Sequence, residues 1–407
     1  MKCRFCSTSL GRPFLSLGSS PLANAFLDED SLRCPEQSYP LEVYICGCCF
    51  LVQLEAHETP EKIFTDYPYF SSCSQIWLDH VRQYAGEMIS EMGLGPRHHV
   101  VEVASNDGHL LKNFVARGIP AFGIEPARNL ADFANGEGVP TRCLFFGSAA
   151  AGRLRDEGSG ADLLVANNVL AHVPDLNDFV KGLKTLLNPQ GLLTLEFPHL
   201  LRLVRETQFD TIYHEHFSYF SFAVARNVLA THGLRVHDVR ELGTHGGSLR
   251  LYVSHAEEER IPSDRVAELL RLEEKEGLSD PGTYASFAER VVRLRQDIRM
   301  FLEEKKRQGK SVAGYGAPAK GNTLLNYCGV GRDWISFTVD RNVHKQRKFL
   351  PGSHIPIESP EAIRNARPDY VFILPWNLKE EIMDHMAFIR EWGGRFVVPV
   401  PALRVLE

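Results

Sequence analysis

The stretch His99-Val-Val-Glu-Val-Ala-Ser-Asn-Asp-Gly108 decides the fold of this chain. It is a short run rich in β-branched residues that ends in small and polar residues, and a helix-like segment follows at residues 110–115. The next strand, Ala121-Phe-Gly-Ile-Glu125, ends in a carboxylate. Strand, small-residue loop, helix and strand in this order predict a doubly wound α/β unit with a nucleotide at its first loop. Further strands are expected at residues 162–166 and 192–197.

The residues of the first loop, at positions 104–108, indicate which kind of nucleotide it can bind. A dinucleotide-binding loop would carry Gly-x-Gly-x-x-Gly, but Ala104 and Asn106 stand where glycines are needed. With an acid inside the first strand, the loop resembles motif I of class I S-adenosylmethionine-dependent methyltransferases, where that acid helps hold the methionine end of the cofactor. The resemblance implies these cofactor-binding residues: Glu102, Ser105, Asn106, Gly108, Glu125, Pro126 and Asn167.

Composition limits the remaining classes of function. The chain has 407 residues, which is too long for one core and predicts two or three domains. A net charge of −6 argues against nucleic acid as a partner. No apolar run approaches the roughly 20 residues that span a bilayer, and the first residues lack an apolar signal core. We therefore expect a cytoplasmic α/β protein without a membrane partner.

The first fifty residues contain two Cys-x-x-Cys pairs with the spacing of a metal-binding motif, Cys3/Cys6 and Cys46/Cys49. Two thiolates separated by two residues reach one ion from a tight turn, and two such pairs complete a tetrahedral site. Cys48 competes with Cys49 as the register alternative. Four cysteine ligands leave no open position for a substrate, so the pattern predicts a structural zinc ion in a small N-terminal domain.

A run of ionisable side chains, Tyr213-His-Glu-His216, is the main candidate for chemistry. Imidazole can take and give a proton near neutral pH, and a neighbouring phenol can donate a hydrogen bond to charge on an oxygen. Four polar groups in a row are costly to bury for packing alone. His172, after the fourth strand, is a second candidate, with a core or capping histidine as the alternative. The spacing of His214 and His216 is not that of a metalloprotease helix.

A second α/β unit is expected near the C-terminus. Residues 287–307 have the periodicity of an amphipathic helix. Gly314-Tyr-Gly316 then precedes Lys320, and a strand is expected at Ile335–Asp340. Glycines followed by a lysine at a helix start suit a pyrophosphate, so we expect Lys320 near a diphosphate. A degenerate repeat that only packs is the alternative.

The order of motifs is more specific than any one of them. In order, the chain carries Phe50-Leu-Val-Gln-Leu, Tyr69-Phe-Ser-Ser, Val101-Glu-Val-Ala-Ser-Asn-Asp-Gly108, Ala166-Asn-Asn-Val-Leu-Ala-His172, Tyr213-His-Glu-His216-Phe, Thr244-His-Gly-Gly-Ser-Leu-Arg250, Gly314-Tyr-Gly-Ala-Pro-Ala-Lys-Gly-Asn-Thr323 and Pro375-Trp-Asn-Leu378. This series resembles the zinc-containing sugar C-methyltransferases that build branched deoxysugars such as mycarose, noviose and tetronitrose.

The resemblance implies three domains and an activity. Residues 1–66 would bind zinc, 67–280 would form the class I methyltransferase Rossmann-like domain, and 281–407 a second Rossmann-like domain for a nucleotide sugar. The reaction would be C-methylation of a keto-deoxysugar, dTDP-linked, at C-3 or C-5. His216 would remove the proton beside the ketone, Tyr213 would hydrogen-bond the sugar oxygen, and Glu215 would orient an imidazole or contact the sugar. Substrate-binding residues would be Tyr69, His214, Gly316, Lys320 and Asn322.

Two other classes of function stay open on the sequence alone. An NAD-dependent nucleotide-sugar epimerase or dehydrogenase would also need two α/β units, although the first loop lacks the dinucleotide glycines. A non-catalytic binding protein on a methyltransferase fold is the other. The sequence identifies neither the nucleotide sugar nor the methylated carbon, and it leaves the oligomeric state open, with a monomer as one expectation.

Overall fold

The first α/β unit is built around a mixed sheet. The computed structural model describes residues 1–65, 71–73 and 75–407, and within them seven strands follow the order β10-β11-β8-β7-β4-β5-β6. The central strand β4 (Val100–Val103) is buried along its whole length, as expected for a parallel strand covered on both faces. The other strands are β5 (Ala121–Glu125), β6 (Thr141–Cys143), β7 (Ala161–Asn167), β8 (Leu187–Pro198), β10 (Leu234–Leu242) and β11 (Ser248–His255).

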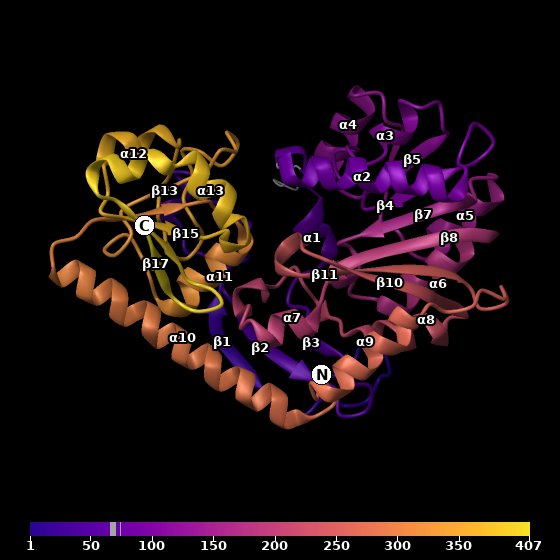
Figure 1. Cartoon of the computed structure of the whole chain (residues 1–407), viewed down its shortest axis with the longest axis horizontal. Helices are drawn as coiled ribbons and strands as arrows, with labels where there is room; N and C mark the ends of the chain where they lie inside the picture. Colours follow the sequence, from indigo (N-terminus) through magenta and orange to yellow (C-terminus); the bar gives the residue numbers. More distant parts are fainter. Residues whose placement is uncertain (66–70, 74) are drawn as a thin grey trace.

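Helices cover both faces of this sheet (Figure 1). Apolar residues of α2, α3 and α4 pack with Val100 on one face, and those of α5, α6, α8 and α9 pack with Val101 and Val103 on the other. The side chain of Glu102 falls on the α2 side because neighbours along a strand alternate. The helices are α1 (Pro60–Phe64), α2 (Gln75–Met92), α3 (Lys112–Val115), α4 (Arg128–Gly136), α5 (Ser148–Asp156), α6 (Leu176–Leu186), α7 (Leu200–Arg205), α8 (Phe222–Thr231) and α9 (Asp264–Lys275).

The second α/β unit has its own sheet, ordered β14-β13-β12-β15-β16-β17. Its strands are β12 (Val312–Tyr315), β13 (Thr338–Val339), β14 (Ile357–Glu358), β15 (Tyr370–Ile373), β16 (Arg395–Val398) and β17 (Arg404–Leu406), with helices α11 (Ala319–Cys328), α12 (Glu361–Ala366) and α13 (Lys379–His385). The expected strand at residues 335–340 is shorter than predicted, because a turn with Ile335 N donating to Gly331 O occupies its start.

The long helix α10 (Pro281–Arg307) runs along the second unit toward the first (Figure 1). It begins earlier than the apolar periodicity predicted, because Asp280 caps it through Gly282 N and Pro281 stands at its first turn. Its buried face includes Phe287, Val291 and Ile298. These residues belong to one apolar core that extends from the second sheet to the N-terminal sheet.

The N-terminal sheet takes one strand from the middle of the chain. Its order is β1-β2-β3-β9, all antiparallel, with β1 (Leu15–Ser20), β2 (Tyr39–Ile45), β3 (Val52–Leu54) and β9 (Ser218–Tyr219). Val52 pairs with Tyr219 and Gln53 with Ser218, directly after the Tyr213–His216 run. We propose domain boundaries near residues 66 and 280, and β9, from the middle domain, joins the sheet of the N-terminal domain. No helix in the described ranges combines the length and apolarity needed to cross a bilayer.

In both α/β sheets the order of successive strands reverses at the first strand. In the first sheet β5 lies on one side of β4 and β7 on the other; in the second, β13 and β15 flank β12 in the same way. Ligands of open α/β sheets bind at such switch points, beyond the carboxyl ends of the strands. The loops after β4, β7, β12 and β15 are therefore the places where ligands are expected.

Candidate active site and cysteine cluster

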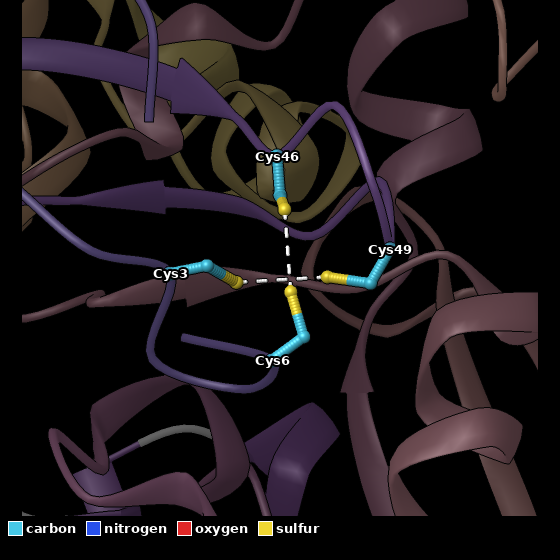
Figure 2. Close-up of side chains that lie close together, drawn as sticks. All are labelled: Cys3, Cys6, Cys46 and Cys49. Carbon is cyan, nitrogen blue, oxygen red and sulfur yellow. Dashed lines mark hydrogen bonds between the residues drawn. The ribbon is translucent and has the colours of Figure 1, made fainter. Parts of the chain in front are cut away.

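The four predicted cysteines meet in space. Figure 2 shows their thiols turned toward one another from two turns, with Cys3 Sγ 3.5 Å from Cys49 Sγ and Cys6 Sγ 3.5 Å from Cys46 Sγ. All four sulfur atoms lie within 4.8 Å of one another. Sulfurs at ~2.3 Å from a tetrahedral zinc ion would be about 3.8 Å apart, so the donor set fits that ion. Cys48 is exposed and outside the cluster, which favours Cys49 over the register alternative.

Arg4 links this cluster to the segment that carries the candidate catalytic residues. Its backbone N–H donates to Gln53 Oε1, and Gln53 Nε2 lies 3.3 Å from Cys3 Sγ. The Arg4 guanidinium donates to the carbonyls of Pro174 and Leu54 and lies 5.3 Å from the centre of the Phe217 ring. Arg4, in the first cysteine turn, therefore contacts both β3 and Phe217, and β3 is the strand that pairs with β9.

The tautomer of His216 follows from its hydrogen bonds. Its Nδ1 lies 2.9 Å from the carbonyl oxygen of Thr211, which can only accept, so the neutral ring carries its proton on Nδ1. Nε2 is then the acceptor of the Tyr213 hydroxyl at 2.9 Å, and the two ring centres are 4.0 Å apart. The structure thus joins the predicted base and the predicted phenol, with the basic nitrogen facing the phenol.

His172 lies against the same ring. It comes from the turn η3 (Leu170–His172) after β7, and its ring centre is 4.7 Å from that of His216. The Phe64 ring stacks edge-on at 5.6 Å from His172. Burial, and then the charge of His172, hold the pKa of His216 well below its ordinary value, and burial lowers the pKa of His172 to about 4. Both imidazoles are therefore neutral at pH 7.

Glu215 and His214 point to the N-terminal unit. Asn24 Nδ2 donates to both carboxylate oxygens of Glu215, at 2.9 and 2.8 Å. His214 Nε2 lies 3.1 Å from the carbonyl oxygen of Pro40, and its ring packs edge-on against Tyr39. The ring hydrogen bonds of His214 and His216 go to carbonyls or to Tyr213, so the predicted orientation of an imidazole by Glu215 stays a prediction. Asn24 was missed because a lone asparagine in a loop carries no local signal.

The crevice beyond β4 and β7 contains buried polar atoms that have no partner among the described residues. They are Glu102 Oε2, Ser105 Oγ and both side-chain polar atoms of Asn167. Burial, followed by the nearby carboxylates of Asp107 and Glu125, raises the pKa of Glu102 well above its ordinary value. Buried polar groups normally have a partner. These atoms therefore fit a polar ligand, and an ammonium beside Glu102 would offset the clustered negative charge.

Glu125 closes the other side of this crevice. Its carboxylate accepts the backbone N–H of Asn106 at 2.8 Å and that of Ala127 at 2.9 Å. The loop after β4 reaches it through left-handed backbone at Ala104, Asn106 and Gly108, with φ of 57°, 51° and 77°. A side chain at Gly108 would press on Ala134 and Val139. Pro126 follows directly, and its carbonyl faces the thiol of Cys143.

The second switch point has an acidic side chain in the same position as Glu125 in the first. Asp340, after β13, accepts the N–H of Ala317 at 2.7 Å and that of Asn342 at 2.8 Å, as Glu125 does in the first sheet. Gly316 has a φ of 89° and packs against Pro375, so the loop and the turn after β15 touch. Sequence reasoning missed Asp340 as a site residue, although its place at the end of a predicted strand was a usable signal.

Lys320 and Asn322 belong to α11, which contacts the candidate catalytic segment through Thr323 and Ile212. Lys320 Nζ donates to Asn377 Oδ1 at 2.8 Å and lies 4.6 Å from the centre of the Trp376 ring. Asn322 is buried and donates to the carbonyl oxygen of Ala23 at 2.6 Å. Their predicted contacts with substrate stay predictions. Tyr69 lies outside the described residues.

Known proteins match the chain along its whole length. A family model described as a zinc binding domain matches residues 3–64, a methyltransferase domain matches 77–239, and a C-methyltransferase C-terminal domain matches 243–401. The C-methyltransferase NovU of Streptomyces niveus is 39% identical over 406 residues, covering 100% of this chain and 97% of the relative.

Solved methyltransferases are similar over a smaller part. Magnesium protoporphyrin IX methyltransferase of Synechocystis PCC 6803, with bound SAM, is 15% identical, covers 44% of this chain and 79% of its own, and has a TM-score of 0.34. The CcbJ methyltransferase of Streptomyces caelestis is 11% identical, covers 43% of this chain and 89% of its own, and has a TM-score of 0.35.

Two half-buried imidazoles, His172 and His245, predict that the protein loses stability in mild acid. Burial lowers the pKa of His172 and His245 to about 4 each, whereas an unfolded histidine titrates near ~6.5. Between these values the unfolded chain binds protons that the folded chain does not, so the free energy of unfolding falls as the pH falls. The slope is up to about 1.4 kcal/mol per pH unit for each group. Denaturant titrations at pH 7, 6 and 5 measure how the free energy of unfolding changes with pH. His172→Gln should make this slope smaller, and an unchanged slope in that variant would show that His172 does not contribute to it.

Proposed function

The chain belongs to the S-adenosylmethionine-dependent C-methyltransferases that carry an N-terminal zinc-binding domain, and we propose that its acceptor is a keto sugar linked to a nucleoside diphosphate. The observation that supports this acceptor is the neutral His216–Tyr213 pair. His216 packs on His172, after β7 of the first sheet, and Ile212, next to Tyr213, accepts a hydrogen bond from α11 of the second unit. The switch points of the two α/β sheets suit two ligands, one for each sheet. Carbon is methylated only after it becomes a carbanion equivalent, and a ketone makes the neighbouring C–H acidic enough.

The cofactor would lie in the first crevice. Glu102 and Asn167 would face its methionine end, and Glu125 would accept the ribose hydroxyls, as the acid of a second strand does. Ser105, Asn106, Gly108 and Pro126 would form the wall, where left-handed backbone brings the loop close. When bound, S-adenosylmethionine supplies an electrophilic methyl group, and the residues of this chain bind and orient it.

The nucleotide sugar would bind to the second unit. We propose that Gly316, Lys320 and Asn322 of this unit, with Tyr69 and His214, contact the substrate, a dTDP-linked keto-deoxysugar that is methylated at C-3 or C-5. Binding energy from the nucleotide can orient the reacting carbon, which accounts for a whole domain that performs no chemistry.

His216 would perform the proton transfer. Its Nδ1–H is fixed on Thr211 O, so Nε2 is the nitrogen that can accept the proton from the carbon beside the ketone. Tyr213, now on that nitrogen, would turn its hydroxyl to the sugar oxygen as charge develops there. Incubation of the protein with S-adenosylmethionine and a dTDP-linked 4-keto-6-deoxyhexose, followed by mass spectrometry, tests the proposal. Gain of one methylene by the sugar supports it, and transfer only to oxygen would refute it.

We propose one zinc ion per chain, held by Cys3, Cys6, Cys46 and Cys49 and needed for folding rather than turnover. Metal analysis of active protein should find one equivalent of zinc, because four thiolates leave no open position. Cys48→Ser is the matched control and should keep the metal, since this thiol is exposed and outside the cluster. Active, folded protein without zinc would contradict the proposal.

Glu125→Ala should weaken binding of S-adenosylhomocysteine by roughly 1–3 kcal/mol, because charge-assisted hydrogen bonds to the ribose are lost. Isothermal calorimetry measures this. Glu137→Ala removes a surface carboxylate that pairs with Lys112 and should leave the affinity unchanged. Equal affinities in the Glu125 variant and the parent would remove this residue from the site.

His216→Asn should reduce turnover by about 10²–10⁴ with both ligands still bound, because an amide cannot act as a base near neutral pH. Solvent deuterium exchange beside the ketone, measured without S-adenosylmethionine, isolates proton removal from methyl transfer. Tyr213→Phe should cost less, and the surface variant His385→Asn should match the parent. Exchange at the parent rate in His216→Asn would place the base elsewhere.

A further inference from the structure

The ammonium of Lys320 lies where the second sheet meets the catalytic segment. Its residue stands in the first turn of α11, and both of its side-chain partners, Trp376 and Asn377, come from the turn η6 (Trp376–Leu378) after β15. Lysine is rarely withdrawn from water unless it is paired. Burial lowers the pKa of Lys320, so part of its hydration has been lost. Such a position needs an explanation.

The described residues do not use all of its hydrogen-bonding capacity. An ammonium has three N–H donors, and Asn377 Oδ1 accepts one of them. The Trp376 face offers a cation–π contact. The carboxylate of Asp210 is close enough for its charge to raise the pKa of Lys320, but its Oδ2 accepts the indole N–H of Trp376 at 2.6 Å. At least one N–H of Lys320 is therefore left for a ligand.

Direct contacts fix this ammonium to the catalytic segment. One turn along α11, Thr323 Oγ1 donates to the carbonyl oxygen of Ile212, next to Tyr213. Trp376 bonds to Asp210, three positions before Tyr213. The charge of Lys320 lowers the pKa of both His216 and His245. The cation and the proposed base thus belong to elements that are in direct contact, and the charge of one influences the other.

We propose that Lys320 donates a hydrogen bond to the ketone oxygen of the acceptor sugar and stabilises the enolate formed there. This proposal rests on the proposed function above. In the step, the C–H bond beside the ketone breaks and its proton goes to His216 Nε2. The electron pair forms the carbon–carbon double bond, and the carbonyl electrons move to the oxygen, where the ammonium and the Tyr213 hydroxyl meet the negative charge. No oxidant or further reactant is needed.

Lys320 would then contact the ketone oxygen rather than the diphosphate that the sequence pattern predicted for it. A diphosphate is attached to the anomeric carbon, whereas methylation at C-3 or C-5 occurs elsewhere on the ring. In a 4-keto hexose the ketone lies across the ring from the anomeric carbon, so an ammonium on the ketone oxygen does not also hold the diphosphate. The Asp210 carboxylate nearby would also repel a dianion, but it helps keep one cation in place.

Lys320→Met tests the assignment, because it keeps the aliphatic stem and removes the charge. With a dTDP-linked 4-keto-6-deoxyhexose and no S-adenosylmethionine, solvent deuterium exchange should slow by about 10²–10³, the usual effect of losing one donor to a developing oxyanion. Calorimetry with thymidine diphosphate alone should give a Kd within about twofold of the parent. Lys320→Arg should recover part of the exchange rate, and the surface variant Lys306→Met should behave as the parent.

Asn377→Ala is a milder second variant, since it removes the side-chain amide whose oxygen holds the ammonium but keeps the charge of Lys320, and it should slow exchange less than Lys320→Met. Tenfold weaker thymidine diphosphate binding in Lys320→Met, with parent exchange at saturating sugar, would overturn the proposal in favour of a diphosphate contact. Parent exchange rates in both variants would overturn it as well. If the parent protein itself does not exchange, the proposed function fails first and Lys320 loses its role with it.

Discussion

The pairing of β3 with β9 is the constraint on which the candidate active site depends. Residues 209–220 form little regular structure, yet most are buried, so their backbone groups need partners from elsewhere. The N-terminal sheet supplies them by the Val52–Tyr219 and Gln53–Ser218 pairs and by Leu54 N donating to Phe217 O. The turn η3, after β7 of the first unit, contributes the carbonyl of Ala171 to Phe217 N, and the second unit contributes Thr323 to Ile212 O. Three units therefore hold one segment, and none could place His216 alone.

The two α/β sheets share a pattern of backbone hydrogen bonds to an acidic side chain at the switch point, but different side chains line the space beyond it. Glu125 accepts the N–H of Asn106, in the loop after β4, and that of Ala127, two residues after Glu125 itself. Asp340 likewise accepts an N–H from the loop after β12 and one from two residues after itself. Beyond β4, polar side-chain atoms are left unpartnered within the described ranges, whereas beyond β12 the side chains of Pro375 and Trp376 pack against the loop and against Gly246. The first crevice is thus lined by several polar atoms that can pair with a ligand, whereas beyond β12 the turn after β15 packs on the loop and Asn322 Oδ1, in α11, has no partner among the described residues.

Local pattern explains what could be predicted. Buried parallel strands are apolar throughout, so β4, β5 and the carboxylate of Glu125 were visible in the sequence, as were the paired cysteines, whose spacing is set by the ion they suit. The candidate catalytic run, Tyr213–His216, was visible because its ionisable residues are adjacent in the sequence. The sequence could not reveal Asn24, Asp210 or β9, because their roles arise from contacts between residues far apart in the chain. Asn24 and Glu215, for example, are almost two hundred positions apart. A two-residue strand has no periodicity to detect, and a buried aspartate bonded to Trp376 looks like any turn residue.

The borrowed strand has a consequence for synthesis. About 165 residues separate Leu54 from Tyr219, so at ~5–20 residues per second the edge of β3 stays unpaired for roughly ten to thirty seconds after it leaves the ribosome. Open strand edges are templates for pairing with other chains, and short edges reduce that hazard. β3 is three residues long and follows directly on the second cysteine pair, so the nascent hairpin exposes little edge while it waits. The shortness of this strand protects the growing chain from aggregation until its partner arrives.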